Sequence, residues 1–195
     1  MARPREFDTD QALERALEVF WAQGFEATSV TDLKGAMGIE TGSLYKAFGN
    51  KRALYVAAVE RYIARGERFQ MRLLASKEPI SDGIAQLFEA IVEIATDPSG
   101  RGCFVVNCAI EHGATDAEIQ SLLGRQEAAL SRYLRDRIAA DQTKGLVPSV
   151  IAADALASYV SATIGGIQVL AKKGASKQTL SGVAQAALQV FRLTP

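Results

Sequence analysis

Histidine and cysteine, the residues that build most metal centres and crosslinks, are scarce in this sequence. It has one histidine and two cysteines among 195 residues. Cys103 and Cys108 are five positions apart, so on a helix their side chains would point about 140° apart, which is poor geometry for a disulfide. One histidine with this cysteine pair does not make a zinc site. We therefore expect two reduced thiols, no metal site and no cofactor.

Long apolar runs and catalytic motifs are also missing. No run approaches the roughly 20 apolar residues that span a bilayer, and the charged stretch 1–6 does not look like a signal peptide. We therefore expect a cytoplasmic protein with no membrane partner. The sequence contains no G-x-S-x-G, no P-loop, no dinucleotide-binding glycine pattern and no paired histidines. We expect that it is not an enzyme.

Charge is balanced overall but is unevenly distributed. The formal net charge is zero, yet residues 46–72 carry seven basic residues against two acidic ones. Such a block is typical of a surface that binds an anion, including nucleic acid. A solvated helix face would have the same composition, so charge alone leaves both interpretations open. We expect the block to lie away from any pocket.

Apolar residues recur with helical spacing along nearly the whole chain, and no long stretch alternates with period two. The candidate caps for the early helices are Asp8, then Thr28 or Ser29, and then Asn50. These signals predict an all-α protein, with helices at 8–24, 30–38, 41–48, 50–75, 81–96, 101–113, 116–140, 149–172 and 176–193. The joint 76–83 contains a proline and a glycine and predicts a domain boundary, giving domains 1–50 and 76–195 joined by the helix 50–75.

The segment 30–48 has the pattern of a helix-turn-helix. "VTDLKGAM" is the first helix, "GIE" the turn and "TGSLYKAF" the second helix, which in this motif lies in the major groove of DNA. Leu44 and Phe48 are four residues apart and should face inward. Other residues of the second helix, and one at the start of the next helix, should face DNA bases or phosphates. These residues are Thr41, Gly42, Ser43, Tyr45, Lys46 and Lys51.

The stretch "GFEATSVTDLKGAMGIETGSLYKAFGNKRAL" resembles the DNA-binding signature of the TetR family of transcriptional repressors, over residues 8 to about 60. The resemblance implies an N-terminal helix-turn-helix domain and a C-terminal bundle that binds ligand and dimerises. It also implies a homodimer on a palindromic operator in double-stranded DNA, released by a small-molecule effector, with Thr28 as a further phosphate contact. Lys34, Gly35 and Ala47 depart from the family pattern. They leave open a helical adaptor that binds protein instead of DNA.

The resemblance also implies an effector pocket among the middle helices, for which position suggests Phe88, Ile91, Phe104 and Leu130. "GRGCFVVNCAIEHG" is similar to a segment of those TetR-like regulators that sense electrophiles or oxidants through a cysteine. Cys103 is the candidate sensor thiol because Arg101 and free helix N–H groups are nearby. A small buried apolar role is the alternative for Cys103. We expect Cys108 to lie in the core and His112 to serve either packing or ligand contact.

The last two predicted helices are rich in small residues, which allow close helix packing. In TetR-like proteins these helices form the four-helix bundle of the dimer. The resemblance therefore implies a homodimer interface in the first of them, shared between the chain's own core and the partner. Its residues would be Leu156, Tyr159, Val160, Ala162, Thr163, Gly166, Ile167 and Leu170.

Overall fold

The computed structural model describes residues 7–75, 78–112 and 115–192, and all regular structure in these ranges is helical. This confirms the predicted all-α class. None of these helices is both long and apolar enough to cross a membrane. The elements are α1 (Thr9–Gln23), α2 (Val30–Met37), α3 (Thr41–Phe48), α4 (Lys51–Ala75), α5 (Ile80–Ala95), α6 (Phe104–His112), α7 (Ala117–Thr143), α8 (Ala153–Lys172), α9 (Lys177–Leu188) and a 3₁₀ turn at Gln189–Phe191.

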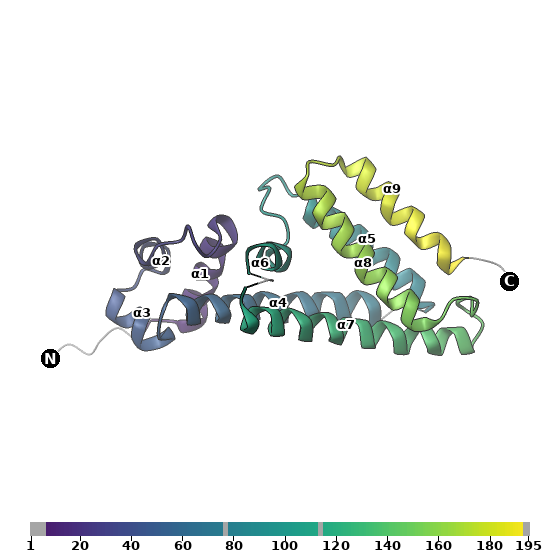
Figure 1. Ribbon diagram of the computed structural model, residues 1–195, viewed down its shortest axis with the longest axis horizontal. Helices are drawn as coiled ribbons and strands as arrows, with labels where there is room; N and C mark the ends of the chain where they lie inside the picture. The colour runs from purple at the N-terminus through teal and green to yellow at the C-terminus, as the bar shows by residue number, and fades with distance from the viewer. Residues whose placement is uncertain (1–6, 76–77, 113–114, 193–195) are drawn as a thin grey trace.

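The helices form two groups joined by α4. The helices α1, α2 and α3 gather at one end, and α4 runs from them along the length of the molecule beside α7 (Figure 1). The helices α5, α8 and α9 pack together at the other end, and α6 lies between the two groups. In this arrangement α4 links the N-terminal helices to the C-terminal bundle and is packed against helices of both groups.

Local capping explains where the early helices start. The Asp8 side chain accepts hydrogen bonds from the amides of Asp10 and Gln11. Ser29 and Asp32 form a reciprocal capping box at α2, which satisfies two amides that a helix start leaves without partners. The Asn50 Oδ1 accepts from the Ala53 amide at 2.8 Å. Caps act over three or four residues, and the sequence therefore predicts them correctly.

Several predicted boundaries are wrong, most clearly at α6. We expected a helix over 101–113, but it begins at Phe104. Gly100 and Gly102 have φ angles of +66° and +65°, a left-handed conformation that ends helical geometry. The predicted end at Gly113 lies outside the described residues. The helix α8 starts at Ala153 instead of 149, α7 continues to Thr143, and α9 gives way to the 3₁₀ turn after Leu188.

The buried apolar residues form two clusters. One joins α5, α7, α8 and α9 around Phe88, Leu134 and Val160. The other joins α1 to α4 around Phe20 and Tyr55, and it also takes in Phe104, Cys108, Ile119 and Leu122 from α6 and α7. The N-terminal helices therefore share their core with the C-terminal segment. Residues 76 and 77 of the predicted boundary lie outside the described residues, and the boundary itself stays a prediction.

Candidate nucleic-acid interface and ligand cavity

The turn between α2 and α3 holds α3 at the surface by a small number of apolar contacts. Gly38 ends α2 in a left-handed conformation with φ +69°, and Ile39 then enters the core. Leu44 is the buried residue of α3, and Phe48 packs half-buried against the same cluster. This confirms that Leu44 and Phe48 face inward.

The rest of α3 forms an outward surface. Gly42, Lys46 and the 43% exposed ring of Tyr45 are open to solvent, whereas Thr41 and Ser43 are half-buried. No side chain caps the start of α3, so its first amides are available to an anion. The structure thus brings five of the predicted DNA-binding residues onto one short helix.

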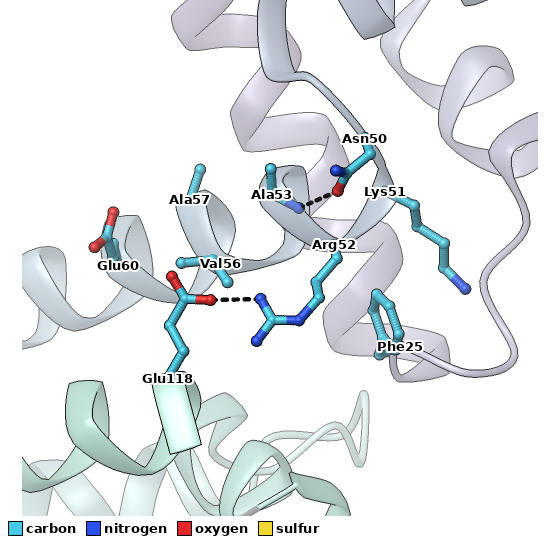
Figure 2. Close-up of a pocket in the computed structure, with 9 residues that line it drawn as sticks. All are labelled: Phe25, Asn50, Lys51, Arg52, Ala53, Val56, Ala57, Glu60 and Glu118. Atoms are coloured by element: carbon cyan, nitrogen blue, oxygen red, sulfur yellow. Dashed lines mark hydrogen bonds and ion pairs between the residues drawn. The ribbon is translucent and has the colours of Figure 1, made fainter. Parts of the chain in front are cut away.

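The start of α4 adds a cation next to this surface. The Lys51 Nζ lies 4.3 Å from the centroid of the Phe25 ring, and no described carboxylate pairs with it. Arg52 points in another direction, toward Glu118 on α7, as Figure 2 shows. Lys51 therefore keeps its charge for an external partner, and Arg52 uses its charge inside the protein.

Thr28 does not have the exposure that a phosphate contact requires. The residue is 1% exposed, and its hydroxyl donates to the Gly24 carbonyl oxygen at 2.6 Å. This geometry contradicts the predicted contact with DNA. Thr28 instead stabilises the turn between α1 and α2.

Part of the basic block 46–72 borders a cavity, contrary to our expectation, although most of its side chains are exposed. Arg65 and Arg72 line the cavity described next. Three arginines form ion pairs with α1 or α7 at N···O distances of 2.5–3.0 Å: Arg52 with Asp116 and Glu118, Arg61 with Asp10 and Glu14, and Arg65 with Glu14. These pairs tie α4 to its neighbours, and exposed pairs of this kind contribute little stability individually.

A cavity of about 540 Å³ lies between α4, α5, α6, α7 and α8 and reaches Trp21 on α1. Its size is in the range of small-molecule sites. Ile91 and Leu130 line it as predicted, whereas Phe88 and Phe104 lie in the core and are not among its lining residues. The sequence missed its other main walls, which include Trp21, Tyr62, Gly66, Phe69, Gln70, Val106 and Ser161. The spacing of Tyr62, Gly66, Phe69 and Gln70 on one face of α4 was the available signal.

The two cysteines occupy different environments, and both are free thiols. Cys103 is half-buried, lines the cavity and directly precedes α6. The Tyr62 hydroxyl lies 3.9 Å from the Cys103 Sγ, and burial together with this thiol raises the pKa of Tyr62, which keeps it a hydrogen-bond donor. Cys108 is fully buried, and burial raises its pKa to about 12. The core position predicted for Cys108 is confirmed.

The C-terminal end of α6 is attached to the turn after α1. The Glu111 carboxylate accepts hydrogen bonds from the Phe25 and Glu26 amides at 3.0 and 3.1 Å. The His112 ring packs edge-on against Phe25 and Tyr55, which agrees with the packing interpretation of this histidine. The Trp21 Nε1 also donates to the Gly102 carbonyl at 3.0 Å. The cavity wall is thus bonded directly to the N-terminal helices.

The predicted dimer residues of α8 divide into two faces. Leu156, Val160, Thr163 and Ile167 are buried within the chain's own core, because the strongest apolar periodicity of α8 marks its contact with α5 and α7. The other predicted residues are Tyr159, Ala162 and Gly166, which are exposed, and Leu170, which is half-buried. Gly182 and Ala186 of α9 are exposed as well. A dimer interface on these helices would therefore use only their exposed faces.

Two family models match the chain. The first, described as bacterial regulatory proteins of the tetR family, matches residues 12–58. The second, the tetracyclin repressor-like C-terminal domain, matches residues 82–187. The chain belongs to the TetR family. It is a DNA-binding transcriptional regulator, and the resemblance found in the sequence is confirmed.

Relatives of this TetR-family chain include two repressors of Escherichia coli K12. The HTH-type transcriptional repressor ComR is 31% identical over 97% of this chain and 91% of its own length. The HTH-type transcriptional repressor BdcR is 25% identical over 97% of this chain and 92% of its own length. A solved structure of a cysteine mutant of the TetR family regulator CifR contains a 26-base-pair operator DNA. It is 30% identical in sequence, the match covers 97% of this chain and the whole of the CifR chain, and the TM-score is 0.84. Reduced E. coli NemR, at 19% identity and a TM-score of 0.85, shares the fold.

The departures from the TetR pattern do not disturb the helix-turn-helix. The Lys34 ammonium pairs with Glu40 at 2.9 Å on the surface. No heavy atom lies within 4 Å of the place where a Cβ of Gly35 would stand, and Ala47 is exposed. The features that favoured a protein-binding adaptor therefore have ordinary structural explanations, and family membership favours the regulator.

Proposed function

We propose that the chain is a homodimeric repressor that binds a palindromic operator through α3 and leaves it when a small molecule enters the cavity. The observation that carries this proposal is the outward face of α3, whose start has no side-chain cap. Lys51 follows α3 by three residues, and no carboxylate in the described part of the chain pairs with its ammonium. Most of the neighbouring arginines are occupied within the protein, so this face is the surface best suited to DNA.

The residues of this face have two roles in the proposal. Lys46, Thr41 and Ser43 face base edges in the major groove, where Lys46 can donate to a guanine. Gly42, Tyr45 and Lys51 contact phosphates, which position the protein without reading sequence. Thr28 has no direct role because its hydroxyl is already bonded.

The proposed dimer packs the exposed faces of α8 and α9 against their copies in a second chain. Tyr159, Ala162 and Gly166 on α8 and Gly182 and Ala186 on α9 supply this surface. Small residues permit close approach of the helices, and a twofold axis would place two α3 helices in successive major grooves, about 34–36 Å apart.

Release from DNA follows from the position of the cavity along α4. Gln70 in the cavity wall lies 19 residues after Lys51, a distance of about 28 Å along a helix. A ligand that binds one position of α4 better than another shifts the population of dimers, and it can lower the affinity for DNA only by its own differential affinity.

The test is fluorescence anisotropy with labelled DNA from the region next to the protein's own gene. We expect salt-dependent binding that prefers a palindromic segment over scrambled DNA of the same composition. A Lys46→Ala, Tyr45→Ala double variant should lose this binding, and Lys173→Ala at the C-terminal end of α8 should not. Equal binding by both variants would remove α3 from the interface.

A further inference from the structure

Two residues that line the cavity have buried polar atoms without a hydrogen-bond partner among the described residues. Three side-chain atoms in the described residues are buried and make no hydrogen bond, and two of them, the Gln70 Oε1 and the Ser161 Oγ, belong to residues of the cavity wall. They come from different helices, α4 and α8. A buried polar atom without a partner is costly, so a ligand whose polar groups match these two atoms would gain from binding at this cavity.

Unlike these two atoms, the charged residues of the cavity wall are not buried. Arg65, Arg72 and Glu127 are exposed and Glu67 is half-buried, so none of the four is a buried partner for an ion. Arg65 is in addition paired with Glu14. A charged ligand group inside the cavity would lose its water without gaining a buried counter-ion, which is unfavourable.

Most of the remaining wall is apolar or small, and Gln126 and Gln168 are its other amide side chains. Aromatic rings of Trp21, Tyr62 and Phe69 line the cavity, and Gly66 and Gly165 open space on α4 and α8. Apart from the neighbouring backbone of the same helix, no described atom lies within 4 Å of the place where a Cβ of either glycine would stand. This surface fits a compact apolar body, aromatic or branched.

We infer that the cavity binds an uncharged molecule with an apolar body and a hydroxyl or N–H group that donates to the Gln70 Oε1, with Ser161 as a second polar contact. The inference rests on the proposed function only in taking this cavity as the effector site. The hydrogen bond to Gln70 would attach the ligand directly to α4, the helix that begins at Lys51.

The test uses three probes that share one body: 4-propylphenol, which can donate; 4-propylanisole, which cannot; and 4-propylbenzoate, which is charged. Trp21 is the chain's single tryptophan and lines the cavity, so its fluorescence, excited where the phenol is transparent, reports binding in the intact protein. We expect the phenol to bind about fivefold more tightly than the anisole, as one net hydrogen bond provides. The benzoate should bind at least about tenfold more weakly than the phenol.

Two variants locate the effect. Gln70→Met should remove the preference for the phenol over the anisole, and Gln126→Met should keep it, because Gln126 lines the same cavity from α7 without a buried unpartnered atom. Thermal unfolding checks that both variants fold. Equal binding of all three probes to the wild type, or a phenol preference that survives in Gln70→Met, would overturn the inference. Phenol binding that follows the predicted pattern but leaves the operator complex intact would instead count against ligand-induced release.

Discussion

The two halves of α4 belong to one helix but differ in how fully their polar groups are satisfied. At its start, Asn50 caps the helix, Arg52 bonds to Asp116 and Glu118, and Lys51 lies over the Phe25 ring. Farther along, Gln70 presents a buried oxygen without a partner, and Gly66 borders open space. The first half is fastened to its surroundings, whereas the second half borders a cavity.

Because of this difference, a ligand can form new contacts at one end of α4 and affect DNA binding at the other end. New contacts form most readily in the cavity half, because unpaired atoms and volume are available there. Any displacement of α4 must then change the contacts of Lys51 and Arg52 at the other end. Five predictions test this contrast.

The largest effect should come from breaking the pairing of α8 and α9 with their copies in the proposed dimer. Gly166→Arg places a long charged side chain on the exposed face of α8. We expect monomers and a loss of operator affinity of at least about a hundredfold, because the second half-site no longer binds as part of the same complex. Sedimentation and anisotropy measure the two effects. Gly124→Arg, on the exposed face of α7, is the matched control, and a dimer that persists in both variants would contradict this interface.

The next effect concerns base recognition by α3. Lys46→Ala should cost about 1–3 kcal/mol at one base position of each half-site and relax discrimination there. Binding to operators mutated one base pair at a time measures this loss. If the variant loses the same affinity on every operator, Lys46 contacts phosphate and does not read a base.

Lys51→Ala should weaken binding to all DNA alike, because a phosphate contact carries no sequence information. The slope of log K against log salt should become shallower by about one. Tyr45→Phe is the matched neutral change, and it should weaken binding without altering the slope. An unchanged slope for Lys51→Ala would mean that its ammonium stays on the Phe25 ring in the complex.

A smaller effect is expected where α4 is fastened to α7. Hydrogen bonds from the Ile119 and Glu118 amides, together with the charge of Arg52, lower the pKa of Asp116. A carboxyl whose folded pKa is depressed stabilises the protein above its ordinary pKa, and the contribution is lost as pH falls through the folded value. Asp116→Asn should therefore flatten the loss of melting temperature in acid. Arg52→Met should lower the melting temperature only slightly at neutral pH, since exposed ion pairs are weak.

The smallest effect on DNA binding itself should be that of Cys103→Ser. The variant should bind operator as the wild type does, and it should lose any response to quinones or peroxide if Cys103 is a sensor. Thiol labelling of the folded wild type should modify one cysteine per chain, since burial keeps Cys108 protonated. A response that persists in Cys103→Ser would leave Cys103 with a packing role.

The parts of the structure that the sequence predicted are those determined over short distances. Caps at Asp8, Ser29 and Asn50 and the inward positions of Leu44 and Phe48 depend on neighbours within one helical turn. Phe104 was misplaced because its partners are distant in the chain, and Thr28 because a local bond to the Gly24 carbonyl was overlooked. Phe104 joins the N-terminal core through contacts with α4, and Thr28 is buried by the turn around it. The periodicity of α8 marked the core face and could not show which residues a partner chain would contact.

The shallow attachment of α3 has a consequence for how such a protein can change over generations. Leu44 is the one residue that α3 buries, and Phe48 supports it from the edge. Substitutions at the other positions therefore alter the outward chemistry at little cost in folding stability. A lineage could acquire a new target sequence by drift along this single helix, while the cavity and its ligand preference stayed under separate selection.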